Sequence, residues 1–308
     1  MLLRIRSILV ATDLSEGAAE VLRGAGALAD LADAELHVVN AVDPHTVRMG
    51  DVTVEEAKAS ATDAVKEQLH ASLPQRTPVT TCRVTVGTPH EVILQRSRDL
   101  GVDLVVIGPH RERAEGSGEL GTTADRLIRT CDAPCLVLRA PLSLPLRRML
   151  VSSDLSAAAG GAVNLALVWA GALRLPSATG ERTRLRAVHV APPAQGATRA
   201  SGGREEDERE LREQVAEAVR SSGVRSLVEI EPVVVEGEEV ADAILRLARE
   251  GTSDLLVMGT HGQNSADRAL IGRVSSVVAR RAACPVLLVP PSFWRTFLAR
   301  EQAVGGRS

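Results

Sequence analysis

Two glycine-bearing segments, each following an apolar run, have residue types suited to holding phosphate. "VVIGPHRERAEGSGELGTT" runs from Val105 to Thr123, and "LVMGTHGQNSADRALIGRVSS" runs from Leu256 to Ser276. A glycine after a strand lets the backbone approach a ligand, and a glycine that opens a helix leaves N–H groups that favour an anion. The spacing indicates a nucleotide site, although glycines after strands also form ordinary turns.

Acidic and imidazole groups near these segments have two interpretations each. Asp13 and Asp154 follow short apolar runs and could accept a hydrogen bond from a ribose hydroxyl, or serve as N-caps of the helices that follow. His110 and His261 lie beside the loops, where a lone histidine is more often solvated than functional. The sequence has no Walker A motif, and no GxGxxG follows either apolar run.

The chain repeats itself once. "SILVATDLSEGAAEVL" from Ser7 corresponds to "RMLVSSDLSAAAGGAV" from Arg148, and "DLVVIGPHR" from Asp103 corresponds to "DLLVMGTHG" from Asp254. In each copy, apolar strand-like runs alternate with helical patterns. This alternation predicts a parallel sheet with right-handed crossovers, whose ligands bind beyond the carboxyl ends of the strands.

The expected fold class is α/β, with two tandem open parallel five-stranded sheets that carry helices on both faces. We place the first domain at residues 1–140, a proline-bearing connector at 141–147, the second domain at 148–290 and a tail helix at 291–308. Extra loop residues in the second copy fall near 176–183, and a polar excursion precedes a helix at 192–208.

Composition narrows the function classes. Of the 308 residues, 44% are hydrophobic but 1% are aromatic, so the core must consist of Ala, Val, Leu and Ile. The net charge of -3 gives no electrostatic case for nucleic acid as a partner.

No apolar run reaches the ~20 residues of a membrane span and no signal peptide is evident, so we expect a cytoplasmic protein. The four cysteines match no zinc or disulfide pattern and are expected as reduced thiols in or near the core.

The doubled pattern resembles the universal stress protein family in its tandem two-domain form. Nucleotide-binding members carry Gly-x2-Gly-x9-Gly followed by Ser or Thr, and an Asp that ends the first strand. The resemblance implies an adenine nucleotide-binding, Rossmann-like fold similar to the adenine nucleotide alpha hydrolases. It implies ATP or another adenine nucleotide as ligand, accompanied by Mg²⁺. It also implies pairing of two units through their final strands, so that the tandem forms a pseudo-dimer and could also form a homodimer.

The resemblance assigns nucleotide contacts residue by residue. Asp would meet ribose, backbone after the second strand would meet adenine, and the glycine loop would hold phosphates. In the first copy these residues are Asp13, Ala41, Ile107, Gly108, His110, Arg111, Gly121, Thr122 and Thr123. In the second copy they are Asp154, Val190, Met258, Gly259, His261, Gly262, Gly272, Arg273, Val274 and Ser275.

Neither copy keeps the whole family pattern. Arg111 replaces the second glycine in the first copy, where its side chain could block phosphate or offer it a cation. Arg273 replaces the hydroxyl residue in the second copy, where a guanidinium still favours phosphate. Because Gly262 is kept, the second copy is expected to bind better. The expected function is non-catalytic, ATP-binding regulation of a stress response; the alternatives are a scaffold without nucleotide and a weak ATP hydrolase.

Overall fold

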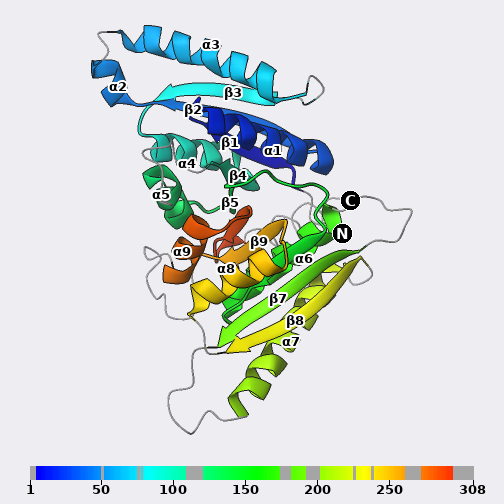
Figure 1. Cartoon of the computed structure of the whole chain (residues 1–308). Coiled ribbons are helices and arrows are strands. Elements are labelled where there is room, and N and C mark those ends of the chain that lie inside the picture. Colours follow the sequence, from blue (N-terminus) through cyan, green and yellow to red (C-terminus); the bar gives the residue numbers. More distant parts are fainter. Residues whose placement is uncertain are drawn as a thin grey trace. The chain divides into compact units, whose positions relative to one another are not determined.

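The computed structural model describes residues 5–49, 52–74, 77, 79–108, 121–173, 182–191, 202–224, 227–236, 239–260 and 272–293 (Figure 1). The chain divides between Leu142 and Ser143 into two compact units. We call them the N-terminal unit and the C-terminal unit and describe each by itself.

The N-terminal unit contains a five-stranded parallel sheet in the order β3-β2-β1-β4-β5. Its strands are β1 (Ser7–Thr12), β2 (Glu35–Val42), β3 (Val79–Val86), β4 (Leu104–Ile107) and β5 (Cys135–Val137). Its helices are α1 (Glu16–Ala32), α2 (Pro44–Met49), α3 (Val54–Ser72), α4 (Pro89–Leu100) and α5 (Thr122–Thr130).

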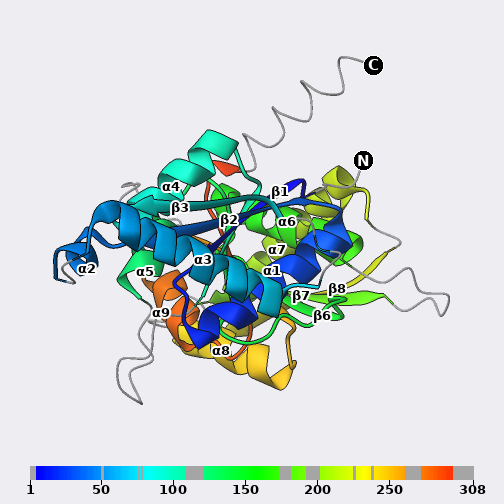
Figure 2. The same ribbon diagram turned by 90° about the horizontal axis from the view of Figure 1, so that it is seen from above.

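Helices cover both faces of this sheet. The chain moves outward from β1 to β3, returns to β4 and continues to β5, so right-handed crossovers place α1 and α3 on one face and α4 and α5 on the other. Accordingly α1 packs with α3, as Figure 2 shows, and α4 packs with α5. The predicted α/β fold is confirmed.

The C-terminal unit has the same topology, with strand order β10-β9-β6-β7-β8. Its strands are β6 (Arg148–Ser152), β7 (Thr183–Ala191), β8 (Val228–Glu236), β9 (Leu255–Gly259) and β10 (Val286–Val289). Its helices are α6 (Ala157–Ala172), α7 (Gly202–Ser222), α8 (Val240–Glu250) and α9 (Arg273–Arg281). The sequence repeat is therefore a structural repeat.

Aliphatic side chains form the cores, as the composition predicts. Ile8, Leu9 and Val10 of β1 are fully buried, and Trp169 of α6 is a rare buried aromatic residue. Burying one such aliphatic side chain contributes about 1.5–3 kcal/mol relative to leaving it exposed. Because helices pack on both faces, β1 and β4 read in the sequence as continuous apolar runs.

Local differences from the sequence-based expectations have simple causes. Helix α2 was not expected, because six residues are too short to show helical periodicity; Pro44 opens it and Asp43 Oδ1 accepts from the His45 N–H at 2.8 Å. Cys131, Cys135 and Cys284 are buried free thiols, but Cys82 is exposed, because β3 is an edge strand. Of the expected tail helix, the described residues include buried Phe293 but none beyond it.

An aspartate ties the starts of two neighbouring strands in each unit. Asp103, just before β4, accepts through Oδ2 from the N–H groups of Arg6 and Ser7, at 2.8 and 3.2 Å. Asp254, just before β9, accepts in the same way from Arg147 and Arg148, both at 2.8 Å. This repeated contact sets the position of the central strand against its neighbour.

Replacing Asp103 or Asp254 by Ala should lower the free energy of unfolding by about 1–3 kcal/mol, because two backbone donors lose a charged acceptor. Chemical denaturation measures the change. The control is Asp63→Ala on α3, whose carboxylate makes an exposed pair with Lys66 at 3.2 Å. A loss no larger than that of the control would contradict the role of the tie.

Candidate functional site

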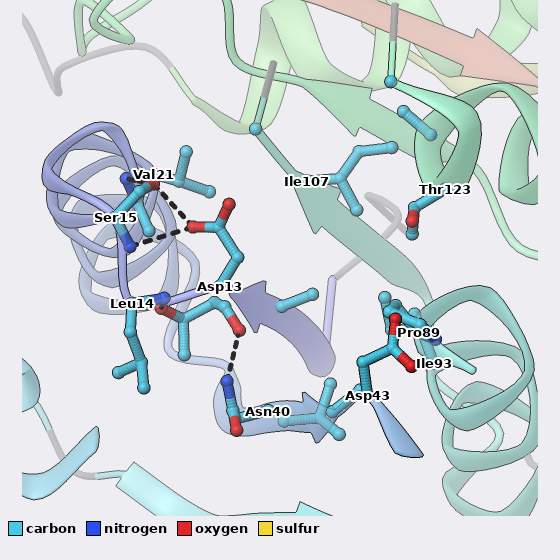
Figure 3. A pocket seen from close by; sticks show the side chains of 18 of the residues that line it. Asp13, Leu14, Ser15, Val21, Asn40, Asp43, Pro89, Ile93, Ile107 and Thr123 are labelled. Carbon is cyan, nitrogen blue, oxygen red and sulfur yellow. Dashed lines mark hydrogen bonds between the residues drawn. The ribbon is translucent and has the colours of Figure 1, made fainter. Parts of the chain in front are cut away.

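A cavity of about 840 Å³ lies in the N-terminal unit at the carboxyl ends of β1, β2 and β4 (Figure 3). Residues of α1, α3, α4 and α5 complete its walls. The chain leaves β1 toward β2 on one side, while β4 adjoins β1 on the other, so the cavity is at the switch in strand order. Open α/β sheets bind their ligands at this position.

The cavity brings together the site residues of the first copy that the structure describes. Its lining includes Asp13, Ala41, Ile107, Gly108, Gly121, Thr122 and Thr123. His110 and Arg111 lie outside the described residues. Val21, Asn40, Asp43, Pro89 and Ile93 also line the cavity, although their sequence context did not single them out.

Asp13 is held by the serine two residues after it. Its Oδ1 accepts from the Ser15 N–H at 3.0 Å and the Ser15 hydroxyl at 2.5 Å (Figure 3). Ser15 is the N-cap of α1 and accepts from the Ala18 N–H at 3.3 Å. The alternative interpretation of Asp13 as the N-cap is therefore wrong. Within the described part of the chain, Asp13 Oδ2 accepts no hydrogen bond and remains available at the cavity.

The turn that carries Asp13 has unfavourable backbone geometry. Leu14 has φ 64°, and Leu155 has φ 65° in the second unit. Non-glycine residues rarely adopt this left-handed conformation, which costs roughly 1–3 kcal/mol. In both units the N–H of the leucine donates to a hydroxyl two residues earlier, that of Thr12 at 3.1 Å or that of Ser153 at 3.0 Å.

A glutamine from α3 bridges the two ends of this turn. The Thr12 hydroxyl donates to Gln68 Oε1 at 2.5 Å, and Gln68 Nε2 donates to the Ser15 carbonyl at 2.9 Å. We call this pair of contacts the Gln68 bridge. It links α3 to the segment between β1 and α1, and it supports the conformation that presents Asp13.

The second unit repeats the bridge. The Ser153 hydroxyl donates to Gln214 Oε1 at 2.5 Å, and Gln214 Nε2 donates to the Ser156 carbonyl at 3.0 Å. Sequence reasoning missed both glutamines, because a glutamine on an amphipathic helix resembles a solvated residue. The Glu-Gln pair shared by the two copies at 67–68 and 213–214 was the available signal.

Replacing Gln68 by Ala should increase amide hydrogen exchange in residues 12–18, because the Leu14 turn loses two supporting contacts. Hydrogen exchange followed by mass spectrometry measures the effect. The control is Gln95→Ala on α4, whose side chain contacts exposed Asp99 at 2.6 Å. Unchanged exchange in residues 12–18 of the Gln68 variant would show that the bridge does not hold the turn.

Gly108 is required by packing. A Cβ at this position would lie 2.8 Å from Cγ2 of Val21, which is buried in α1. The missing side chain therefore lets α1 approach the end of β4. The sequence-based expectation gave this glycine to backbone approach by a ligand, and the structure adds an internal reason for it.

Gly108→Ala should lower the free energy of unfolding by about 1–3 kcal/mol, because the added methyl group overpacks the contact with Val21. Val21→Ala in the same chain should recover part of that loss, although it removes buried methyl groups of its own. A double-mutant cycle by denaturation measures the coupling. Strictly additive losses would contradict the contact.

The far end of the cavity is the start of α5. Gly121 is the N-cap of this helix, and no side chain caps the N–H groups of the first turn. Thr122 and Thr123 add hydroxyl donors, and both line the cavity. A helix start with these donors favours an anion through its dipole. The acidic residue of the first turn, Asp125, is paired with Arg129 at 2.9 Å.

The C-terminal unit places its predicted residues at the corresponding edge of its sheet. Val190 lies near the end of β7, whereas Met258 and Gly259 end β9. Asp154 follows β6 and accepts from the Ser156 N–H at 3.1 Å. His261 and Gly262 lie outside the described residues.

The start of α9 differs chemically from the start of α5. Gly272 is again the N-cap, but exposed Arg273 and half-buried Val274 follow it. The Ser275 hydroxyl is buried and lies 3.2 Å from the Thr260 carbonyl and 2.9 Å from the Gly272 carbonyl. This predicted ligand hydroxyl thus links the residue after β9 to the start of α9.

Thiols with shifted pKa values lie away from the cavity. The neighbouring Cys135 thiol lowers the pKa of Cys131, at the other end of α5, to about 7. The same contact raises the pKa of Cys135 well above its ordinary value. Burial raises the pKa of Cys284 to about 11. None of these three thiols lines the cavity.

The described residues contain no group of three or more His, Cys, Asp or Glu side chains placed to hold a metal ion. Among the helices of the described segments, none has both the length and the apolar character to cross a membrane.

The fold is a tandem α/β arrangement, and its N-terminal unit has a cavity at a switch in strand order. The universal stress protein family profile matches residues 4–139 and 145–290, so the chain belongs to the universal stress protein family. The family resemblance drawn from the glycine loops is therefore confirmed.

Three proteins to which the chain is similar are the following. A universal stress protein of Thermus aquaticus is 33% identical over 134 residues, which are 43% of this chain and 96% of that protein. The crystal structure of a universal stress protein from Archaeoglobus fulgidus matches 94% of this chain and 100% of its own, with a TM-score of 0.70 and 21% identity. A universal stress protein solved in complex with cAMP is 26% identical, covering 49% of this chain and 100% of its own, with a TM-score of 0.35.

Proposed function

We propose that this protein is a non-catalytic regulatory protein of the stress response that binds an adenine nucleotide, with ATP as the main candidate. The observation that carries the proposal is the cavity at the switch point, where residues expected from the family pattern meet. Its volume of about 840 Å³ is within the range of about 300–1,000 Å³ typical of small-molecule sites.

Each end of the cavity suits a different part of a nucleotide. Asp13 Oδ2 would accept from a ribose hydroxyl, and the backbone of Ala41, which lines the cavity, would meet the base. The helix start at Gly121, with the hydroxyls of Thr122 and Thr123, suits the phosphates. Because no cluster of three metal-ligating side chains occurs among the described residues, Mg²⁺ would be held mainly by the phosphate oxygens.

A regulatory role is preferred over catalysis because of the groups that line the cavity. Its carboxylates are Asp13, which is bonded to Ser15, and Asp43, which is bonded to the His45 N–H. A hydrolase would need one of them, Asp154 or a histidine to orient a water molecule. The cytoplasmic location remains a prediction, and so does the pseudo-dimer or homodimer that the family resemblance implies. A scaffold that does not bind nucleotide remains the alternative function.

Equilibrium dialysis of the purified protein with labelled ATP should show retention, and Asp13→Ala should weaken it about tenfold or more, equivalent to about 1.4 kcal/mol, because the ribose loses a charged acceptor. Asp63→Ala, which removes an exposed carboxylate from α3, serves as the matched control. No retention at millimolar ATP would rule out the proposal. Steady release of ADP that vanishes in Asp154→Ala would instead favour the hydrolase.

A further inference from the structure

One wall of the N-terminal cavity is formed by a small and a medium-sized side chain, Ala61 of α3 and Asn40 of β2. Asn40 is in register with Thr12. Its Nδ2 donates to the Thr12 carbonyl at 2.9 Å, as Figure 3 shows, so its side chain is fixed beside β1. Ala41, whose backbone the family pattern assigns to the base, is the next residue of the strand. This wall therefore adjoins the place of the base.

His189 occupies the position of Asn40 in the C-terminal unit. Ser152 is in register with Val188, so His189 stands opposite Ser153, the counterpart of Thr12. His189 Nδ1 lies 2.9 Å from the Ser153 carbonyl. Because a carbonyl only accepts, Nδ1 donates here as the Asn40 amide does. The other ring nitrogen, Nε2, is on the side of the ring away from Ser153.

Asp207 occupies the position of Ala61. The two glutamine bridges make Gln214 the counterpart of Gln68, since both bond the same two groups of the turn. Asp207 precedes Gln214 by seven residues, as Ala61 precedes Gln68. Both pairs lie on continuous helices, α7 and α3, so the equivalence holds in space as well as in sequence.

The two larger side chains meet each other in the C-terminal unit. His189 Nε2 lies 3.9 Å from Asp207 Oδ2, and the side chains are 11% and 15% exposed. A flat ring inserted between two atoms needs about 7–8 Å between them, because each contact distance is about 3.5–4.0 Å. The imidazole and carboxylate thus close the space that an amide and a methyl group border in the N-terminal unit.

The helix starts expected to hold phosphate, those of α5 and α9, also favour binding in the N-terminal unit. The N-terminal cavity offers two threonine hydroxyls at the start of α5, where the C-terminal unit has Arg273 and Val274. The Ser275 hydroxyl of α9 already donates to the Thr260 and Gly272 carbonyls. The hydroxyl donors suited to phosphate therefore favour the N-terminal unit.

We propose that each chain binds one adenine nucleotide, in the N-terminal unit, and that the His189–Asp207 pair excludes the base from the C-terminal unit. This inference rests on the proposed function and deepens it. The glycine spacing alone predicts that the C-terminal copy binds nucleotide better, whereas this inference gives the nucleotide to the N-terminal unit.

Isothermal titration of the full-length protein with ATP tests the inference through stoichiometry. We expect one site per chain, a weakening of that site by about tenfold or more in Asp13→Ala, and no change in Asp154→Ala. The double variant His189→Asn, Asp207→Ala gives the C-terminal unit the residue types that Asn40 and Ala61 provide in the N-terminal unit. This variant should bind a second ATP. Its matched control is His70→Asn, Asp63→Ala, which makes the same changes at exposed positions of α3 and should remain at one site.

The outcomes separate this inference from the proposed function. Absence of ATP binding in the wild-type protein would refute the proposed function, and this inference with it. Two sites in the wild-type protein, or a single site weakened in Asp154→Ala but unchanged in Asp13→Ala, would overturn the assignment while leaving nucleotide binding intact. If the double variant does not fold by circular dichroism, the two aspartate variants decide the question alone.

Discussion

The site depends on a left-handed leucine that must be held against its own conformational cost. Leu14 turns the chain between β1 and α1, and without that turn Asp13 would not face the carboxyl edge of the sheet. The cost of roughly 1–3 kcal/mol is offset by local contacts, in which one hydroxyl receives the leucine N–H and one glutamine joins the two ends of the turn. The helix that supplies the glutamine is therefore part of the site, although only Ala61 of that helix lines the cavity.

The same support is built twice, but the surroundings of the two turns differ. Both units keep the leucine, the hydroxyl and the glutamine bridge, which are internal requirements of the turn. Asn40 and His189 both donate to the carbonyl of the residue that follows or ends the first strand of their unit, but His189 also lies against Asp207. The contacts that support the turn are therefore the same in both units, whereas the side chains beside the expected place of the base differ.

Much of the fold could be predicted from the sequence, because buried parallel strands appear as short apolar runs and the repeat shows each run twice. The site was predictable where a particular residue type follows a strand or opens a helix, as at Asp13 and Gly121. It was not predictable where the role depends on a distant partner. Gln68 acts across 56 residues on Thr12, and His189 faces Asp207 from another element, so neither leaves a local pattern.

The contact between Gly108 and Val21 has a consequence for recognising related proteins. Since an added methyl group at 108 would meet a buried branched side chain, this glycine is needed whether or not anything occupies the cavity. A descendant that had lost its ligand would still retain it for folding. The presence of the first glycine of the family pattern therefore indicates close packing of a helix against the sheet. Evidence for ligand binding must come from positions where packing does not require a particular residue.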